Sequence, residues 1–200
     1  MALSPRTQFV MGGALINLGF RLQDHIEDYD LDGPEELTPD DIFRRMLKQN
    51  QMASRVRDYF PRSARHPLVA LVVCMDSRLD TTELVGDTRK YYYVIRTAGS
   101  VLREKEQDML ELAVQNGVRA VVFTTHSECA AEKVAHDAVA AARFPHLAEA
   151  VAERTDRAAD FMRRPAIAQR IREGKLVVRF AHIHTGTARM EAQAIALPAD

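Results

Sequence analysis

The chain has 200 residues, of which 46% are hydrophobic and 28% are charged, and its formal net charge is −1. A chain of this length and composition can bury one hydrophobic core, so we expect a single soluble α/β domain with an N-terminal extension. The lack of a basic excess argues against nucleic acid as a partner, and no segment indicates binding to a membrane.

The N-terminal part predicts an arm and a connection. Residues 9–20 are apolar, but about a dozen residues are too few to span a bilayer. They also lack a convincing signal-peptide cleavage site. The acidic stretch that follows, with Gly33-Pro34 near its middle, is typical of a solvated connection. We expect residues 1–37 to form the arm and connection, with the arm packed on a neighbouring subunit, and residues 38–200 to form a single α/β domain.

A helix is predicted from Thr38 to about Phe60. Thr38 suits the N-cap, Pro39 the first helical position, and Asp40 and Asp41 the first turn, where acidic groups complement the helix dipole. The apolar stripe of this helix predicts burial in the core or in a subunit interface; it contains Ile42, Phe43, Met46, Leu47, Val56 and Tyr59.

Strands and helices then alternate. Residues 68–73 and 120–123 are continuous apolar runs, which are typical of parallel strands buried on both faces. Residues 91–96 and 175–184 predict two further strands. Residues 104–116, between the predicted strands 91–96 and 120–123, have apolar side chains at helical spacing and predict a helix.

The remaining segments predict helices. Residues 130–143 are rich in alanine and predict one helix, which would place Cys129 at a helix N-terminus, where the dipole favours a thiolate. Residues 146–172 predict one or two helices with an interruption at Pro165.

Both cysteines of the sequence follow predicted strands. Cys74 comes directly after residues 68–73, and His126 and Cys129 follow residues 120–123. Open α/β sheets bind ligands at the carboxyl ends of their strands. Two thiolates and one imidazole would hold zinc with a fourth position open, as in catalytic zinc sites, and such soft ligands select zinc over magnesium or calcium. We therefore predict one zinc ion per chain and a metal-assisted hydration or hydrolysis.

Asp76 and Arg78 lie next to the first cysteine. They can form a bidentate ion pair that leaves a carboxylate oxygen for a nucleophilic water. Two alternatives remain open for the cysteines, which could be small buried hydrophobic residues or could form a disulfide. Nothing else in the sequence indicates an oxidising compartment, so we expect a cytoplasmic protein.

Three ordered motifs resemble those of the β-class carbonic anhydrases. They are Cys74-Met75-Asp76-Ser77-Arg78, Val94-Ile95-Arg96-Thr97-Ala98-Gly99 and His126-Ser127-Glu128-Cys129. The resemblance extends from about Pro67 to Gly186 and is greatest to a compact bacterial branch. That branch also includes enzymes that hydrolyse carbonyl sulfide or carbon disulfide.

The resemblance implies a mostly parallel central sheet flanked by helices, with the active site near the interface of a homodimer or larger homo-oligomer. It also implies that Cys74, His126 and Cys129 bind the zinc ion. Backbone groups of Ala98 and Gly99 would line the substrate pocket.

The resemblance implies catalytic roles for Asp76 and Arg78. Asp76 would accept a hydrogen bond from the nucleophilic water or, in an inactive closed form, bind the metal itself. Arg78 would hold Asp76 away from the metal. The expected reaction is the reversible hydration of carbon dioxide to bicarbonate.

Two positions depart from the family pattern and keep other functions open. Thr97 stands where the family usually has Asn, and Ala130 where it usually has Gly. One alternative is the hydrolysis of carbonyl sulfide or carbon disulfide. The other is a catalytically silent protein that keeps zinc for folding or assembly. Asp76 and Arg78 favour an enzyme, because a purely structural zinc site has no need for an orienting pair.

Overall fold

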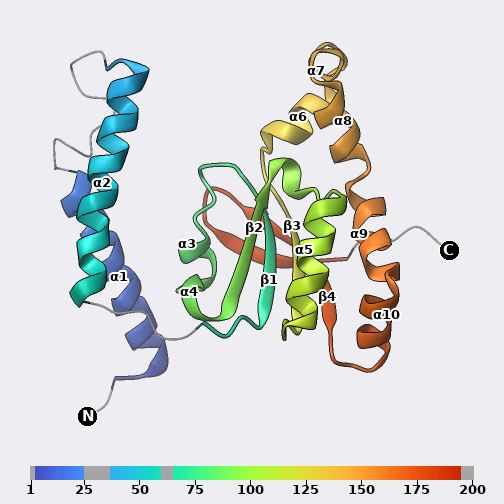
Figure 1. Cartoon of the computed structure of the whole chain (residues 1–200), viewed down its shortest axis with the longest axis horizontal. Coiled ribbons are helices and arrows are strands. Elements are labelled where there is room, and N and C mark those ends of the chain that lie inside the picture. Colours follow the sequence, from blue (N-terminus) through green and yellow to red (C-terminus); the bar gives the residue numbers. More distant parts are fainter. Residues whose placement is uncertain (1–2, 25–36, 60–64, 195–200) are drawn as a thin grey trace. The chain divides into compact units, whose positions relative to one another are not determined.

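The chain divides into two units, Met1–Ala64 and Arg65–Asp200. The computed structural model describes residues 3–24, 37–59 and 65–194 (Figure 1). The first unit contains α1 (Pro5–Asp24) and α2 (Pro39–Tyr59), so the predicted N-terminal arm is helical. Most of the predicted acidic connection lies outside the described residues. The predicted domain limits, 1–37 and 38–200, stay a prediction.

The start of α2 confirms the predicted helix and its cap. The Asp41 backbone N–H donates to Thr38 Oγ1 over 3.2 Å, and the Thr38 N–H donates back to the Asp41 carboxylate over 3.1 Å. This reciprocal arrangement satisfies backbone donors at the helix start. None of the residues described in this unit is buried. None of the helices in the described ranges combines the length and apolar character that a membrane span requires.

The second unit is built on a five-stranded sheet with the order β2-β1-β3-β4-β5. Neighbouring strands from β2 to β4 are parallel, and β5 runs antiparallel to β4. The predicted α/β fold with a mostly parallel sheet is therefore confirmed. The strands are β1 (Val69–Cys74), β2 (Tyr92–Thr97), β3 (Ala120–His126), β4 (Val177–His184) and β5 (Arg189–Gln193).

Helices lie in the connections from β1 to β2, β2 to β3 and β3 to β4, whereas the turn of residues 185–188 joins β4 to β5 (Figure 1). The long helix predicted between the second and third strands is present as α5. The helical elements of this unit are α3 (Thr81–Val85), α4 (Thr88–Tyr91), the 3₁₀ turn η2 (Ala98–Ser100), α5 (Glu104–Gln115), α6 (Ala130–His136), α7 (Ala138–Arg143), α8 (Pro145–Ala152), α9 (Arg154–Arg163) and α10 (Pro165–Arg172).

Two hydrophobic clusters cover β1 from opposite faces, because successive side chains of a strand alternate. Ala70 and Val72 belong to a cluster with residues of α5, α9 and α10, whereas Leu71 and Val73 belong to a cluster with residues of α3, α6 and α8. All four of these side chains are buried. This two-sided burial accounts for the continuous apolar run in the sequence.

The prediction of one helix over residues 130–143 is wrong. Asp137 adopts an extended conformation (φ −102°, ψ 117°) between α6 and α7. Its carboxylate accepts a hydrogen bond of 2.7 Å from the Ala140 N–H, so Asp137 caps α7 and ends α6. Residues 145–172 form three helices instead of the predicted one or two, because the chain also breaks between Ala152 and Arg154; the predicted interruption at Pro165 is where α10 begins.

Strand β5 was not predicted. Met190 and Ala192 alternate with polar residues in Arg189–Gln193, but the segment is only five residues long and is mainly exposed. It pairs with β4 at the edge of the sheet, with Ile183 opposite Met190. This pairing, rather than burial of an apolar face, defines the strand.

Substitution of Phe161 tests the assignment of the hydrophobic core around β1. Phe161 is 0% exposed, and its ring meets that of Phe123 edge-on at 6.2 Å between centroids. Phe161→Ala should lower the free energy of unfolding by about 3–5 kcal/mol, because it leaves a cavity beneath α9. Phe144→Ala is the matched control, since Phe144 is 47% exposed and should lose less than about 1 kcal/mol. Equal losses in denaturant titrations would contradict this assignment of the core.

Candidate metal centre

The parallel pairing of β1 and β3 brings the three predicted ligands to one edge of the sheet. Cys74 is the last residue of β1 and His126 is the last residue of β3. Cys129 follows in the next turn as the N-cap residue of α6, as predicted. Two segments far apart in sequence therefore meet because adjacent parallel strands end on the same side.

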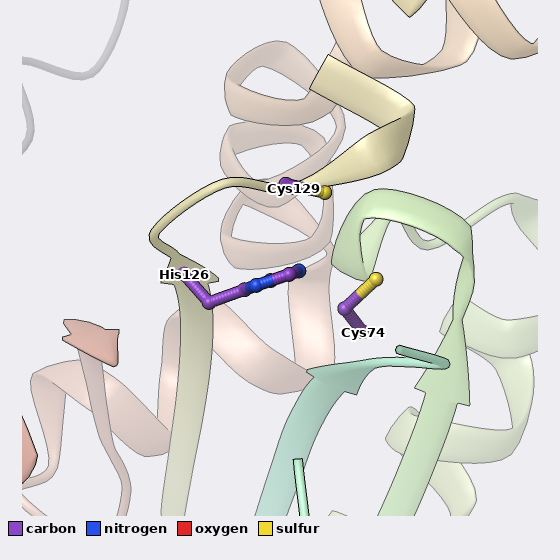
Figure 2. A group of neighbouring side chains, drawn as sticks. All are labelled: Cys74, His126 and Cys129. Atoms are coloured by element: carbon purple, nitrogen blue, oxygen red, sulfur yellow. The ribbon is translucent and has the colours of Figure 1, made fainter. Parts of the chain in front are cut away.

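The side chains of Cys74, His126 and Cys129 converge (Figure 2). Their ligand atoms all lie within 4.8 Å of one another. All three residues are buried, at 4%, 2% and 2% exposure. Within the described ranges, no other group of three or more His, Cys, Asp or Glu residues has this proximity.

The imidazole of His126 has one nitrogen engaged and one free. Nδ1 lies 3.1 Å from the Ser127 carbonyl oxygen, which suits the tautomer with its proton on Nδ1. Nε2 is buried and has no hydrogen-bond partner. A buried polar atom without a partner is costly, and a metal ion would satisfy it. The donor set of two sulfurs and one imidazole nitrogen fits zinc.

The two thiols titrate as a pair. A hydrogen bond from Cys129 lowers the pKa of the Cys74 thiol well below its usual range, and the backbone N–H groups of Asp76 and Gly99 also stabilise the thiolate. Thiolate formation at Cys74 in turn raises the pKa of Cys129, although the N–H groups of Ala131 and Glu132 oppose this. The Cys129 side chain forms no capping hydrogen bond at the start of α6. One thiolate is therefore available to a metal ion, and binding would release the remaining proton.

The loop between His126 and Cys129 is held against the end of β4. The Ser127 N–H donates to the Ile183 carbonyl over 3.0 Å, and the Ser127 hydroxyl lies 3.1 Å from that of Thr185. Glu128 has a positive φ of 58°, which turns the chain back so that Cys129 faces His126. This conformation is uncommon for a residue other than glycine.

Asp76 and Arg78 form the predicted bidentate pair. Arg78 Nε donates to Asp76 Oδ1 over 3.0 Å, and Nη2 donates to Oδ2 over 2.8 Å. These hydrogen bonds hold the pKa of Asp76 well below its usual range. In the described part of the chain, Asp76 does not belong to the cluster of metal-ligating atoms. The carboxylate is thus engaged by Arg78 and is not grouped with the metal-ligating atoms.

Arg78 also binds the second loop, which sequence reasoning missed. Its Nη1 lies 3.1 Å from Glu128 Oε2, and its Nη2 donates to the Glu128 carbonyl oxygen over 3.1 Å. The guanidinium therefore joins the loop after Cys74 to the loop before Cys129. The acidic residue inside the His126–Cys129 motif was the only signal for this contact.

Arg96 is a second residue whose role sequence reasoning missed. It lies in β2, and its Nη2 donates to the carbonyl oxygens of Asp76 and Leu79, both over 2.8 Å. These bonds fix the loop that carries Asp76. The signal available in the sequence was a charged residue inside a strand that is otherwise largely apolar.

Ala98 and Gly99 form the turn η2 beside the cysteines. Gly99 has a φ of +62°, and a Cβ at this position would lie 3.0 Å from Val151 Cγ2, so the backbone requires glycine. A largely apolar hollow beside the turn is lined by Thr97, Ala98, Val101, Leu147 and Ala150, with charged residues at its rim. The Thr97 hydroxyl is buried and has no hydrogen-bond partner.

Comparison with solved structures shows the same fold at low identity. One of two tetrameric β-carbonic anhydrases from Sordaria macrospora matches with a TM-score of 0.59 and 18% identity, over 76% of this chain and 97% of that chain. The carbonic anhydrase from Streptococcus mutans gives 0.56 and 21%, over 79% and 99%. The β-carbonic anhydrase CafA of Aspergillus fumigatus gives 0.58 and 18%, over 78% and 92%.

Sequence comparison gives the family directly. No curated protein sequence matches the chain. The profile of the carbonic anhydrase family, however, matches residues 69–185, which is more than half of the chain and includes all three motifs. Together with the fold, this match shows that the chain belongs to the β-carbonic anhydrase family.

Proposed function

We propose that this protein is a zinc enzyme that reversibly hydrates carbon dioxide to bicarbonate. The observation that carries the proposal is the buried cluster of Cys74, His126 and Cys129, in which His126 Nε2 lacks a partner. The Asp76–Arg78 pair beside this cluster supports catalysis over a structural role. Thiol ligands are best maintained in a reducing compartment, so we also propose a cytoplasmic location.

One zinc ion per chain would be held by the two sulfurs and by His126 Nε2. When bound, zinc lowers the pKa of a water molecule from about 15.7 to near 7 and so supplies a hydroxide nucleophile at neutral pH. Burial of the three side chains keeps competing solvent from the ligand atoms and favours a preorganised site.

The chain's own residues orient the reactants. The Asp76 carboxylate accepts a hydrogen bond from the nucleophilic water, and Arg78 prevents this carboxylate from turning toward the metal ligands. The backbone of Ala98 and Gly99 lines the position of the substrate.

Hydrolysis of carbonyl sulfide or carbon disulfide is the second candidate. Both molecules present an electrophilic carbon to the same nucleophile. Thr97 motivates this candidate, because it stands where the family usually has Asn, it is paired with Cys74, and its buried hydroxyl has no hydrogen-bond partner in the described structure. Ala130, directly after Cys129, is the other departure.

Stopped-flow assays of the zinc-loaded protein with the three substrates side by side test the proposed function. We expect carbon dioxide to be turned over fastest. Faster turnover of carbonyl sulfide or carbon disulfide would instead support the second candidate. Turnover of none of them at full zinc occupancy would support a catalytically silent zinc protein.

The zinc ligands are tested by Cys129→Ala. The variant should lose stoichiometric zinc, because one sulfur and one imidazole cannot complete the site. Metal analysis after dialysis against a weak chelator measures this loss. Cys129→Ala with zinc content and affinity equal to the parent's would refute the ligand assignment.

The roles of Asp76 and Arg78 are tested by two substitutions. Asp76→Asn should keep zinc but lose most of its turnover, because an amide accepts a hydrogen bond less strongly and forms no ion pair with Arg78. Arg78→Ala should lose more, since the freed carboxylate can bind the metal. Parental turnover numbers in Asp76→Asn would remove Asp76 from the mechanism.

We also propose a homodimer or a larger homo-oligomer. Apolar side chains of the first unit are exposed, including Phe9 at 67% and Leu15 at 66% on α1 and Phe43 at 56% on α2. Exposed apolar surface of this kind is typical of an interface.

A double substitution tests this assembly. Phe9→Asp with Leu15→Asp, like removal of residues 1–24, should shift the sedimentation coefficient toward that of a smaller species. Val139→Asp on α7, where Val139 is 82% exposed, is the control and should leave assembly unchanged. A doubly substituted protein with the same oligomeric state and melting temperature as the parent would contradict the proposal.

A further inference from the structure

Arg154, the first residue of α9, joins two segments that flank the metal centre. Its Nη1 donates to Glu132 Oε1 over 2.7 Å and to the Gly99 carbonyl oxygen over 3.2 Å. Glu132 belongs to the first turn of α6, and Gly99 belongs to the turn η2. A single guanidinium nitrogen thus connects the two backbone segments.

Both partners of Arg154 belong to segments that lie next to a cysteine. Glu132 is in the first turn of α6, whose N-cap residue is Cys129. Gly99 is in η2, which directly follows β2, and the last residue of β2, Thr97, is paired with Cys74. Cys74 and Cys129 also belong to one buried cluster. A displacement of either segment would therefore move one cysteine relative to the other.

The hydrogen bonds of Arg154 lie in a tightly packed region between η2, α6 and α8. A Cβ built on Gly99 would lie 3.0 Å from Val151 Cγ2 and 3.4 Å from Ala131 Cβ, so the turn is packed tightly against α6 and α8. The side chains of Arg154 and Glu132 are only 25% and 28% exposed. Removal of Arg154 would leave the half-buried carboxylate of Glu132 without its counter-charge. An unpaired buried charge is costly, so we expect the segments around it to shift.

We propose that Arg154 is a positioning residue of the metal site, which holds η2 against the first turn of α6 and thereby fixes the separation of the Cys74 and Cys129 sulfurs. The proposal rests on the proposed function, because it assumes that these sulfurs bind a metal. Arg154 lies outside the three sequence motifs, and its hydrogen bonds in the described ranges go to Gly99 and Glu132 rather than to a predicted ligand. Loss of a residue that hydrogen-bonds a metal ligand directly weakens metal binding about 10–100-fold, so we expect an effect near the lower end of this range for Arg154, which acts through one further contact.

Cobalt(II) binding to the metal-free, full-length protein tests this role. Affinity is measured by competition with a chelator, and the cobalt–thiolate absorption band reports the geometry of the two sulfurs. Arg154→Leu should bind cobalt at least about tenfold more weakly and shift the band. Glu132→Gln keeps the backbone donor and the side-chain shape, so it should give a smaller change in the same direction.

Arg157→Leu is the matched control. Arg157 lies on the same helix, is 23% exposed, and forms ion pairs of 2.9 Å with Glu104 and 2.6 Å with Glu153. Its loss should lower stability without changing the cobalt affinity or the band, because none of these residues contacts the metal centre.

The outcomes separate this role from the proposed function. A parent protein that binds cobalt with a thiolate band, together with an Arg154→Leu variant that matches Arg157→Leu, would overturn the positioning role alone. A parent without a thiolate band would overturn both proposals. If circular dichroism shows that Arg154→Leu is unfolded, Glu132→Gln decides, and a parental band and affinity in that variant would overturn the positioning role.

Discussion

The parallel pairing of β1 with β3 is the constraint on which the rest of this structure depends. It places the carboxyl ends of two strands side by side and so brings Cys74 next to His126. The pairing is maintained by side chains buried on both faces of β1. A metal centre at this edge needs only a short loop to add its third ligand, and the Glu128 turn delivers Cys129 at the start of α6.

Three arginines form hydrogen bonds to the loops and turns around the metal centre. Arg78 joins the loops that follow β1 and β3, and Arg96 binds two carbonyl oxygens of the first of these loops. Arg154 joins η2 to α6. The planar guanidinium has five donors, so one side chain can satisfy carbonyl and carboxylate oxygens of separate segments. The site is therefore rigid although its ligands lie at the ends of elements and in a loop.

Strands β1 to β4 and the three metal-ligating residues could be predicted from sequence, because apolar runs and soft ligand types are local signals. The break at Asp137 could not, since a capping hydrogen bond ends α6 within a stretch of helical composition. Strand β5 was missed because its alternation of polar and apolar residues covers only five mainly exposed positions. The contacts of Arg78 with Glu128 and of Arg154 with Gly99 span about fifty residues, and local sequence carries no information about them. Sequence motifs thus identify what can bind a metal, whereas the tertiary structure shows what holds those residues in place.

In the proposed metal centre, two sulfurs and one imidazole bind zinc and leave one position open. X-ray absorption at the zinc K-edge of the zinc-loaded protein tests this most directly. The account predicts two sulfur scatterers at about 2.3 Å, one imidazole nitrogen at about 2.0–2.1 Å and one further light atom. A first shell without sulfur, or one sulfur with only nitrogen and oxygen ligands, would contradict it.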